Sequence, residues 1–118
     1  MVSYKFTRDS RLLTASHFRA VFTKPIRFGS SHITILITPN ESEKNRLGLA
    51  IAKKRVKLAI QRNRIKRQIR ESFRLNQHVL PHIDIVVMVK SGTDKLENSA
   101  INKQLDKIWL KINQRFKS

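Results

Sequence analysis

The chain has 118 residues, with 25 Lys or Arg against 8 Asp or Glu, so its formal net charge is +17. This length suits one domain, and a hydrophobic content of 40% supplies enough apolar material for a core, which excludes disorder throughout. The absence of Cys excludes disulfides and thiolate chemistry, and no apolar run approaches the roughly 20 residues of a membrane span.

So large a positive charge repels itself unless a polyanion neutralises it, and nucleic acid is the commonest such partner. A small acidic substrate does not need so many cations. The N-terminal segment lacks the apolar stretch of a secretory signal. It contains Arg and Ser, with Asp9 as its only acid before Glu41, and so shares some features with transit peptides. Because the same segment fits a folded domain, we expect a cytoplasmic nucleic-acid-binding protein.

The first predicted element is a short helix. Its apolar stripe has i, i+3 and i+4 spacing and consists of Phe18, Val21 and Phe22. Thr14 or Ser16 can cap its N-terminus, and it must end before Pro25.

Three further segments are predicted to be strands. Residues 33–38 are rich in β-branched side chains, and a short extra strand can form over residues 27–31. In residues 46–52 large Leu and Ile alternate with Gly and Ala. This predicts a strand whose large side chains lie in the core and whose opposite face carries only small side chains. Residues 83–90 are predominantly apolar and end in Lys90; only Asp84 interrupts the apolar run, and for it we weigh an edge position and a salt bridge with a nearby Arg.

Two longer helices complete the prediction. Residues 58–75 carry one apolar stripe, formed by Leu58, Ile65, Ile69 and Phe73. The C-terminal helix carries another, formed by Ile101, Leu105, Ile108, Trp109, Ile112 and Phe116. The order is α-β-β-(β)-α-β-α, which predicts a single-domain α+β fold with a small sheet and helices packed on one face of it.

The most informative segment is residues 53–74, which hold ten of the 25 basic residues and one acid, Glu71. On a helix of 100° per residue most of the basic side chains, together with Asn63, separate cleanly from the apolar stripe. They are Asn63, Arg64, Lys66, Arg67, Arg70 and Arg74. Arg62 falls inside the stripe, so we expect it to extend past the helix start or to reach a polar partner in the adjoining loop.

A solvated surface helix usually mixes charges of both signs, whereas like charges one turn apart repel here. This arrangement favours contact with nucleic acid. Lys53, Lys54 and Arg55 lie just ahead of the helix N-terminus, where free N–H groups and the helix dipole already favour phosphate.

These residues carry a resemblance to a known family. Residues 62–67 read Arg-Asn-Arg-Ile-Lys-Arg, after Gly-Leu-Ala-Ile-Ala-Lys-Lys at 48–54 and before Arg-Glu-Ser-Phe-Arg at 70–74. This pattern resembles the bacterial ribonuclease P protein subunit. The similarity extends over nearly the whole chain: residues 11–13 with Phe18 and Phe22 look like the first helix of the family, and the last strand and the Trp109 helix match as well.

The resemblance implies the protein component of an endoribonuclease that removes the 5′ leader from precursor tRNA. The family's partners are a catalytic RNA, which performs the hydrolysis and binds most of the Mg²⁺, and the precursor tRNA itself. It also implies a ribosomal-protein-like fold with a left-handed β-α-β crossover, opposite to the usual rule. We expect one RNA-binding domain over residues 1–118, with the order of residues 1–9 left open.

The resemblance also implies two binding surfaces. The surface for the catalytic RNA comprises Lys53, Lys54, Arg55, Arg62, Asn63, Arg64, Lys66, Arg67 and Arg70. The cleft for the tRNA leader comprises Arg11, Phe18, Phe22 and Lys53. From the residues alone, a Phe pair at i, i+4 is more often core than a platform for bases, and both interpretations stay open. Many relatives carry an aromatic on the strand corresponding to residues 33–38, but this chain has none, so aliphatic contact replaces stacking there.

We expect no catalytic or metal-binding residue in the protein itself. His78 and His82 are spaced i, i+4, but Pro81 interrupts the helix that a metal-binding pair needs. The acids are scattered rather than placed as in a two-metal nuclease. The alternative functions are a structural ribosomal protein or an RNA chaperone. A DNA-binding protein is less favoured because there is no helix-turn-helix spacing. No membrane or DNA partner is expected.

Overall fold

The computed structural model describes residues 15–40 and 44–116. Four strands form one mixed sheet in the order β1-β2-β4-β3. They are β1 (Ile26–Gly29), β2 (Ile33–Pro39), β3 (Arg46–Ala50) and β4 (Ile83–Val89). β2 is antiparallel to both β1 and β4, whereas β3 is parallel to β4.

The helices are α2 (Ala15–Thr23), α3 (Ala59–Asn76) and α4 (Asn98–Arg115), with short 3-10 turns η1 (Gln77–Val79) and η2 (Thr93–Lys95). This order confirms the predicted α-β-β-(β)-α-β-α arrangement, and the optional extra strand is present as β1. None of the described helices is long and apolar enough to cross a membrane.

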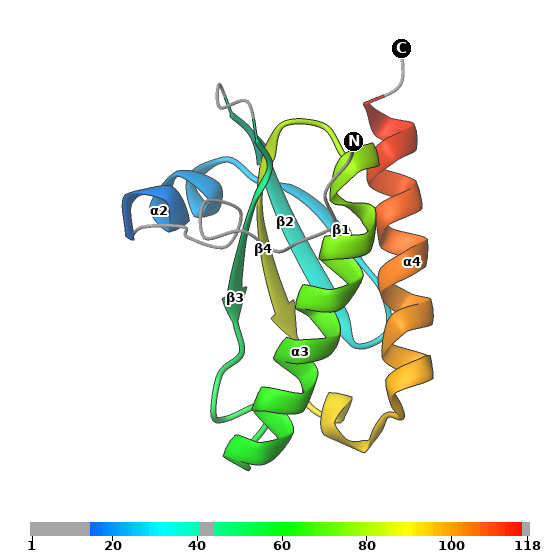
Figure 1. Cartoon of the computed structure of the whole chain (residues 1–118). Helices are drawn as coiled ribbons and strands as arrows, with labels where there is room; N and C mark the ends of the chain where they lie inside the picture. Colours follow the sequence, from blue (N-terminus) through cyan, green and yellow to red (C-terminus); the bar gives the residue numbers. More distant parts are fainter. Residues whose placement is uncertain (1–14, 41–43, 117–118) are drawn as a thin grey trace.

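The connection between β3 and β4 passes through α3. In Figure 1, α3 lies in front of the sheet, both strands run downward and β4 lies to the right of β3. The crossover is therefore left-handed, as the resemblance implied. Since the great majority of such connections are right-handed, the residue pattern alone would have led to the opposite prediction.

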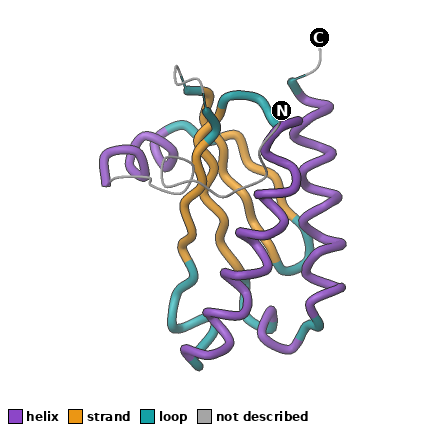
Figure 2. The backbone as a smooth tube through the Cα atoms, viewed as in Figure 1, coloured by secondary structure: helices purple, strands orange, loops and turns teal. Residues whose placement is uncertain are grey.

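The main core lies between one face of the sheet and helices α3 and α4, which pack side by side (Figure 2). Alternate strand residues point to this face because side chains alternate along a strand. The helices contribute most of the predicted stripes, with Ile65, Ile69 and Phe73 fully buried. Phe116 was wrongly placed in the C-terminal stripe, because it follows the end of α4 and is 37% exposed. The indole of Trp109 tilts against Phe73 at a ring-centroid distance of 6.3 Å, and its Nε1 donates to Ser72 Oγ at 2.8 Å.

Helix α2 packs on the other face of the sheet, against β2 and β4, so the prediction that the helices pack on one face was wrong. Val21 packs with Leu36 and Val86, and Phe18 and Ala50 pack against this small cluster. Leu36 and Val86 alternate with residues of the main core and therefore point away from it. A second apolar face needs its own cover, which the short helix provides.

A polar network ties α2 to the sheet. The parallel register sets Arg46 beside Asp84, and their side chains pair through Nε–Oδ1 at 2.7 Å and Nη2–Oδ2 at 2.9 Å. Asn40 Nδ2 also donates to Asp84 Oδ1, and Arg46 Nη1 lies 3.1 Å from His17 Nε2 of α2. The salt-bridge interpretation of Asp84 is confirmed. The edge interpretation is wrong, because β4 has neighbours on both sides.

Two details at helix starts differ from prediction. Leu58 was placed in the apolar stripe but is 62% exposed, because it precedes α3 and has an extended backbone. Ser16 lies inside α2 rather than ahead of it, so it is not the cap. Thr14 lies outside the described residues.

Candidate nucleic-acid interface

The segment after β3 presents cations at the start of α3. We call residues 53–57 the basic loop. Lys53, Lys54, Arg55 and Lys57 are exposed, whereas Val56 between them is buried in the main core. The backbone N–H groups of Arg55 and Val56 donate to Ala52 O at 3.0 and 3.1 Å. The buried Val56 thus fixes a loop whose other side chains all face solvent.

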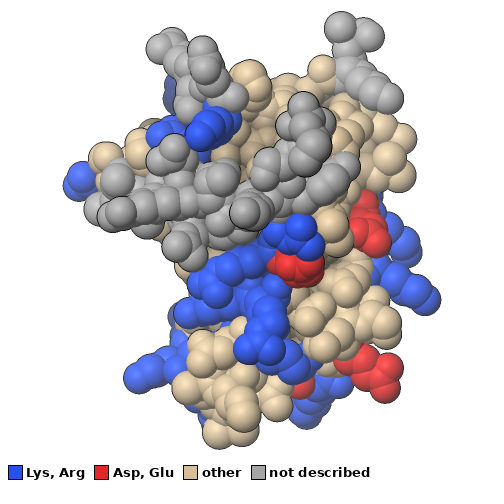
Figure 3. All heavy atoms as spheres, viewed as in Figure 1, with Lys and Arg blue, Asp and Glu red and all other residues tan. Residues whose placement is uncertain are grey.

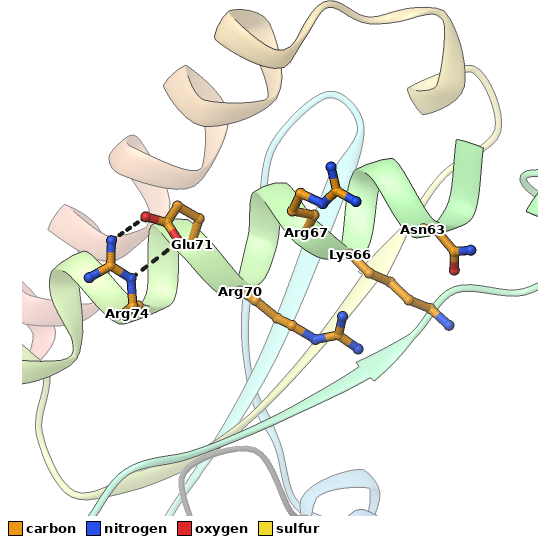
Figure 4. Close-up of a pocket in the computed structure, with 6 residues that line it drawn as sticks. All are labelled: Asn63, Lys66, Arg67, Arg70, Glu71 and Arg74. Carbon is orange, nitrogen blue, oxygen red and sulfur yellow. Dashed lines mark hydrogen bonds and ion pairs between the residues drawn. The ribbon is translucent and has the colours of Figure 1, made fainter. Parts of the chain in front are cut away.

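One side of α3 carries the second group of cations. A shallow hollow of about 430 Å³ is lined by Asn63, Lys66, Arg67, Arg70, Glu71 and Arg74 (Figure 4). Lys66 and Arg70 extend side by side from the helix (Figure 4), and blue side chains form a band over α3 in Figure 3. We call Asn63, Lys66, Arg67 and Arg70 the α3 basic surface.

The cations of this surface have no partners among residues 15–40 and 44–116. Arg67 and Arg70 are exposed and Lys66 is half-buried. None of the three makes a hydrogen bond or ion pair with any residue in the part of the chain that the structure describes. Their donors are therefore available to an external acceptor.

The single acid of the segment does not neutralise these cations, because it is paired one turn further along. Glu71 forms an ion pair with Arg74, in which Arg74 Nε donates to Oε2 at 3.2 Å and Nη2 donates to Oε1. The hydrogen bond from Arg74 lowers the pKa of Glu71 below its ordinary value. The pair is exposed, and Glu71 stays charged at neutral pH. It lines the same hollow as the α3 basic surface but forms its ion pair with Arg74.

The first and third residues of the Arg-Asn-Arg motif are directed at protein acceptors. Arg62 Nη1 donates to Val56 O at 3.0 Å and to Lys57 O at 2.8 Å, which confirms the predicted partner in the adjoining loop. Arg64 donates from Nε to Gln61 Oε1, from Nη1 to Asn98 Oδ1 and from Nη2 to Asp94 O, at 2.9, 2.7 and 3.0 Å respectively. Sequence reasoning missed the Arg64 contacts, because Asn98 and Asp94 are some thirty residues further along the chain.

The residues predicted for the leader cleft lie in different surroundings. Phe18 is half-buried against the sheet, whereas Phe22 is 47% exposed. Lys53 is exposed beyond the end of β3, and Arg11 lies outside the described residues. Phe18 therefore has a packing role whatever else it does, and Phe22 presents a large part of its ring to solvent.

No group of three or more His, Asp or Glu side chains in residues 15–40 and 44–116 is placed to hold a metal ion.

Comparisons with known proteins place these features in a family. The family model described as Ribonuclease P matches residues 6–113. The structure of the RNase P protein of Staphylococcus aureus is 27% identical, with a TM-score of 0.81, covering 92% of this chain and 98% of that one. The RNase P protein of Thermotoga maritima is 26% identical, with a TM-score of 0.74 and the same two coverages.

Proposed function

The chain belongs to the ribonuclease P protein family, the protein component of the endoribonuclease that processes the 5′ leader of precursor tRNA, and we propose that it contributes two RNA-binding surfaces. One surface binds the catalytic RNA and the other binds the leader. The ribosomal-protein and RNA-chaperone alternatives rested on charge alone, and the family match sets them aside. The proposed unit is one domain over residues 1–118, acting in the cytoplasm.

The proposed surface for the catalytic RNA consists of the basic loop and the α3 basic surface. The observation that carries it is the set of three cations, Lys66, Arg67 and Arg70, that project from one helix with no acidic partner among the described residues. Guanidinium groups suit bidentate contact with phosphate, and a cluster of cations on one face suits a folded RNA backbone. Arg62 and Arg64 lie next to this surface and donate to acceptors within the protein.

The proposed surface for the leader is the face of the sheet beside α2. The exposed ring of Phe22 is suited to stacking on an unpaired base, and the half-buried Phe18 forms part of the wall. The neighbouring strand β3 carries small residues beside the apolar cluster that α2 forms with the sheet: Ala50 packs against this cluster and is half-buried. Lys53 and Arg11 are proposed to contact leader phosphates.

We propose that the RNA carries out phosphodiester hydrolysis and binds the Mg²⁺ that this reaction uses. The described residues do not fit a metal site made by the protein alone, because they offer no cluster of ligands. The chain's own contribution is electrostatic: its cations reduce the repulsion between two polyanions that must approach each other.

Reconstitution tests this function directly. Catalytic RNA is mixed with a 5′-extended precursor tRNA at low Mg²⁺, with and without the protein, and the mature 5′ end is measured. We expect the protein to raise cleavage markedly for a substrate with a long leader and less for one with a single-nucleotide leader. Equal cleavage with and without protein would contradict the proposal.

A charge-matched pair of variants locates the catalytic-RNA surface. The first replaces Lys66, Arg67 and Arg70 with Gln. The control replaces three exposed lysines of α4 with Gln, namely Lys103, Lys107 and Lys111. Both lose three positive charges, so a difference in affinity reports position rather than net charge. We expect the α3 variant to bind the catalytic RNA far more weakly than the control.

A further inference from the structure

The Arg-Asn-Arg motif combines two inward arginines with one exposed residue. Arg62 and Arg64 donate to protein acceptors, whereas Asn63 is exposed and lines the hollow on α3. We propose that Arg62 and Arg64 are positioning residues, which hold the basic loop and the start of α4 in place. The phosphates are then contacted by the neighbouring side chains. This inference rests on the proposed function of the surface and assigns different tasks to its arginines.

Arg62 acts on the basic loop. Its Nη1 atom donates to two consecutive carbonyls, those of Val56 and Lys57, which lie just ahead of α3. The loop carries four cations in five positions, and these repel one another. A guanidinium that links the end of this loop to the first turn of α3 holds the four charges in one arrangement. Such preorganisation reduces the entropy lost when the loop binds RNA.

Arg64 acts on the contact between α3 and α4. One donor from each of its three nitrogens is used, and two of the acceptors belong to the region where α4 begins. Asn98 is the first residue of α4, and Asp94 lies in η2 just before it. The guanidinium reaches these acceptors from three separate nitrogens held in one plane, whereas the three donors of a Lys ammonium all lie on a single nitrogen atom.

Arg67 provides the contrast within the same helix. It follows Arg64 by three residues, is exposed, and makes no hydrogen bond or ion pair with residues 15–40 or 44–116. The two arginines are alike in charge and close in sequence. They differ in their surroundings, because Arg64 lies on the side of α3 that faces the start of α4.

The dependence of affinity on salt separates a phosphate contact from a positioning role. Each phosphate contact adds about 0.7 to 0.9 to the slope of log affinity against log salt, through release of counterions. Arg67→Gln should therefore flatten the slope by about that amount. Arg62→Gln and Arg64→Gln should keep the wild-type slope while lowering affinity about tenfold at each salt concentration, the equivalent of one hydrogen bond to a charged group.

Charge-conserving variants sharpen the comparison. Arg67→Lys should keep the wild-type salt slope that Arg67→Gln flattens, because counterion release depends on the charge rather than on the shape of the group. Arg64→Lys should remain as impaired as Arg64→Gln, because Lys keeps the charge and loses the three-way fork. Recovery of binding in Arg64→Lys would overturn the positioning role of that residue.

Amide hydrogen exchange of the free protein tests the positioning role in the absence of RNA. Arg62→Gln should speed exchange of the Arg55 and Val56 amides, which donate to Ala52 O within the loop. Arg64→Gln should instead speed exchange of the Ala100 and Ile101 amides, which donate to Glu97 O at the start of α4. Arg67→Gln should change neither pair.

One result would contradict this inference, and a different result would contradict the proposed function. If Arg62→Gln leaves exchange in the loop unchanged and flattens the salt slope as much as Arg67→Gln does, Arg62 is a phosphate contact and the inference fails. If wild-type protein shows no salt-dependent affinity for the catalytic RNA, the proposed function fails instead. The exchange pattern then still decides whether the two arginines hold the loop and the helix start.

Discussion

Removing the carboxylate of Asp84 should destabilise the protein strongly. The side chain is 6% exposed and accepts three hydrogen bonds, two from Arg46 and one from Asn40. Asp84→Ala deletes the acceptor and leaves the Arg46 guanidinium without its anionic partner in a mostly buried position. The loss is larger than that of an ordinary surface pair because the remaining charge has little access to water.

The size of the effect follows from the burial of the two partners. Breaking a buried ion pair typically costs about 3 to 5 kcal/mol. Arg46 is 21% exposed and can regain some hydration, which favours the lower end, about 3 kcal/mol. An unfolding entropy of about 2.1 cal/mol/K per residue gives about 0.25 kcal/mol/K for 118 residues, so the Tm should fall by about 12 °C.

Urea denaturation followed by circular dichroism measures the free energy of unfolding of wild type, Asp84→Ala, Arg46→Ala and the double variant. The two single losses should not add, because each removes the same interaction. Asp84→Leu with Arg46→Met, which replaces the pair by apolar side chains, should recover most of the stability. A loss below about 1 kcal/mol for Asp84→Ala, the range of an exposed pair, would refute this reasoning.

Three further outcomes are expected. Ser72→Ala leaves the buried indole N–H of Trp109 without an acceptor and should lower the free energy of unfolding by about 1 to 3 kcal/mol, measured by urea denaturation; Ser72→Thr, which keeps the hydroxyl, is the control. Ile69→Ala opens a cavity in the main core and should cost about 2 to 5 kcal/mol in the same assay. The Arg74 guanidinium lowers the pKa of Glu71, so the stability contributed by this pair is present above the unfolded-state pKa and is lost as pH falls through the folded-state value. NMR titration should show Arg74→Gln raising the Glu71 midpoint, and an unchanged midpoint would contradict the pairing.

Local patterns predicted the elements well. The 3.6-residue spacing of Ile65, Ile69 and Phe73 located the buried side of α3, and these residues are fully buried. Period-two alternation located β3, and the β-branched run located β2. Such patterns record which side of an element meets the core, and a sequence carries that information without reference to the rest of the fold. The family match over residues 6–113 confirms the identification drawn from the basic motif.

Predictions that depended on a neighbouring element were less complete. The interpretation of Asp84 needed the register of β3 against β4, which the residue pattern does not contain. The position of α2 on the second face needed the sheet order, which places β4 between β2 and β3. Leu58 was assigned to the stripe only because the helix was assumed to begin one residue too early.

The sequence by itself determined that this is a strongly basic α+β protein with its cations concentrated in residues 53–74, and its motif identified the family. Only the tertiary structure decided which acceptors each cation of the motif reaches. A helical projection gives the direction in which Arg62, Arg64 and Arg67 leave the α3 axis, but not what occupies that direction. Carbonyl oxygens of the basic loop accept hydrogen bonds from Arg62, and residues at the start of α4 accept them from Arg64. Arg67 is exposed to solvent. Three like charges thus have different surroundings, because folding brings acceptors within hydrogen-bonding distance of Arg62 and Arg64 and leaves Arg67 exposed.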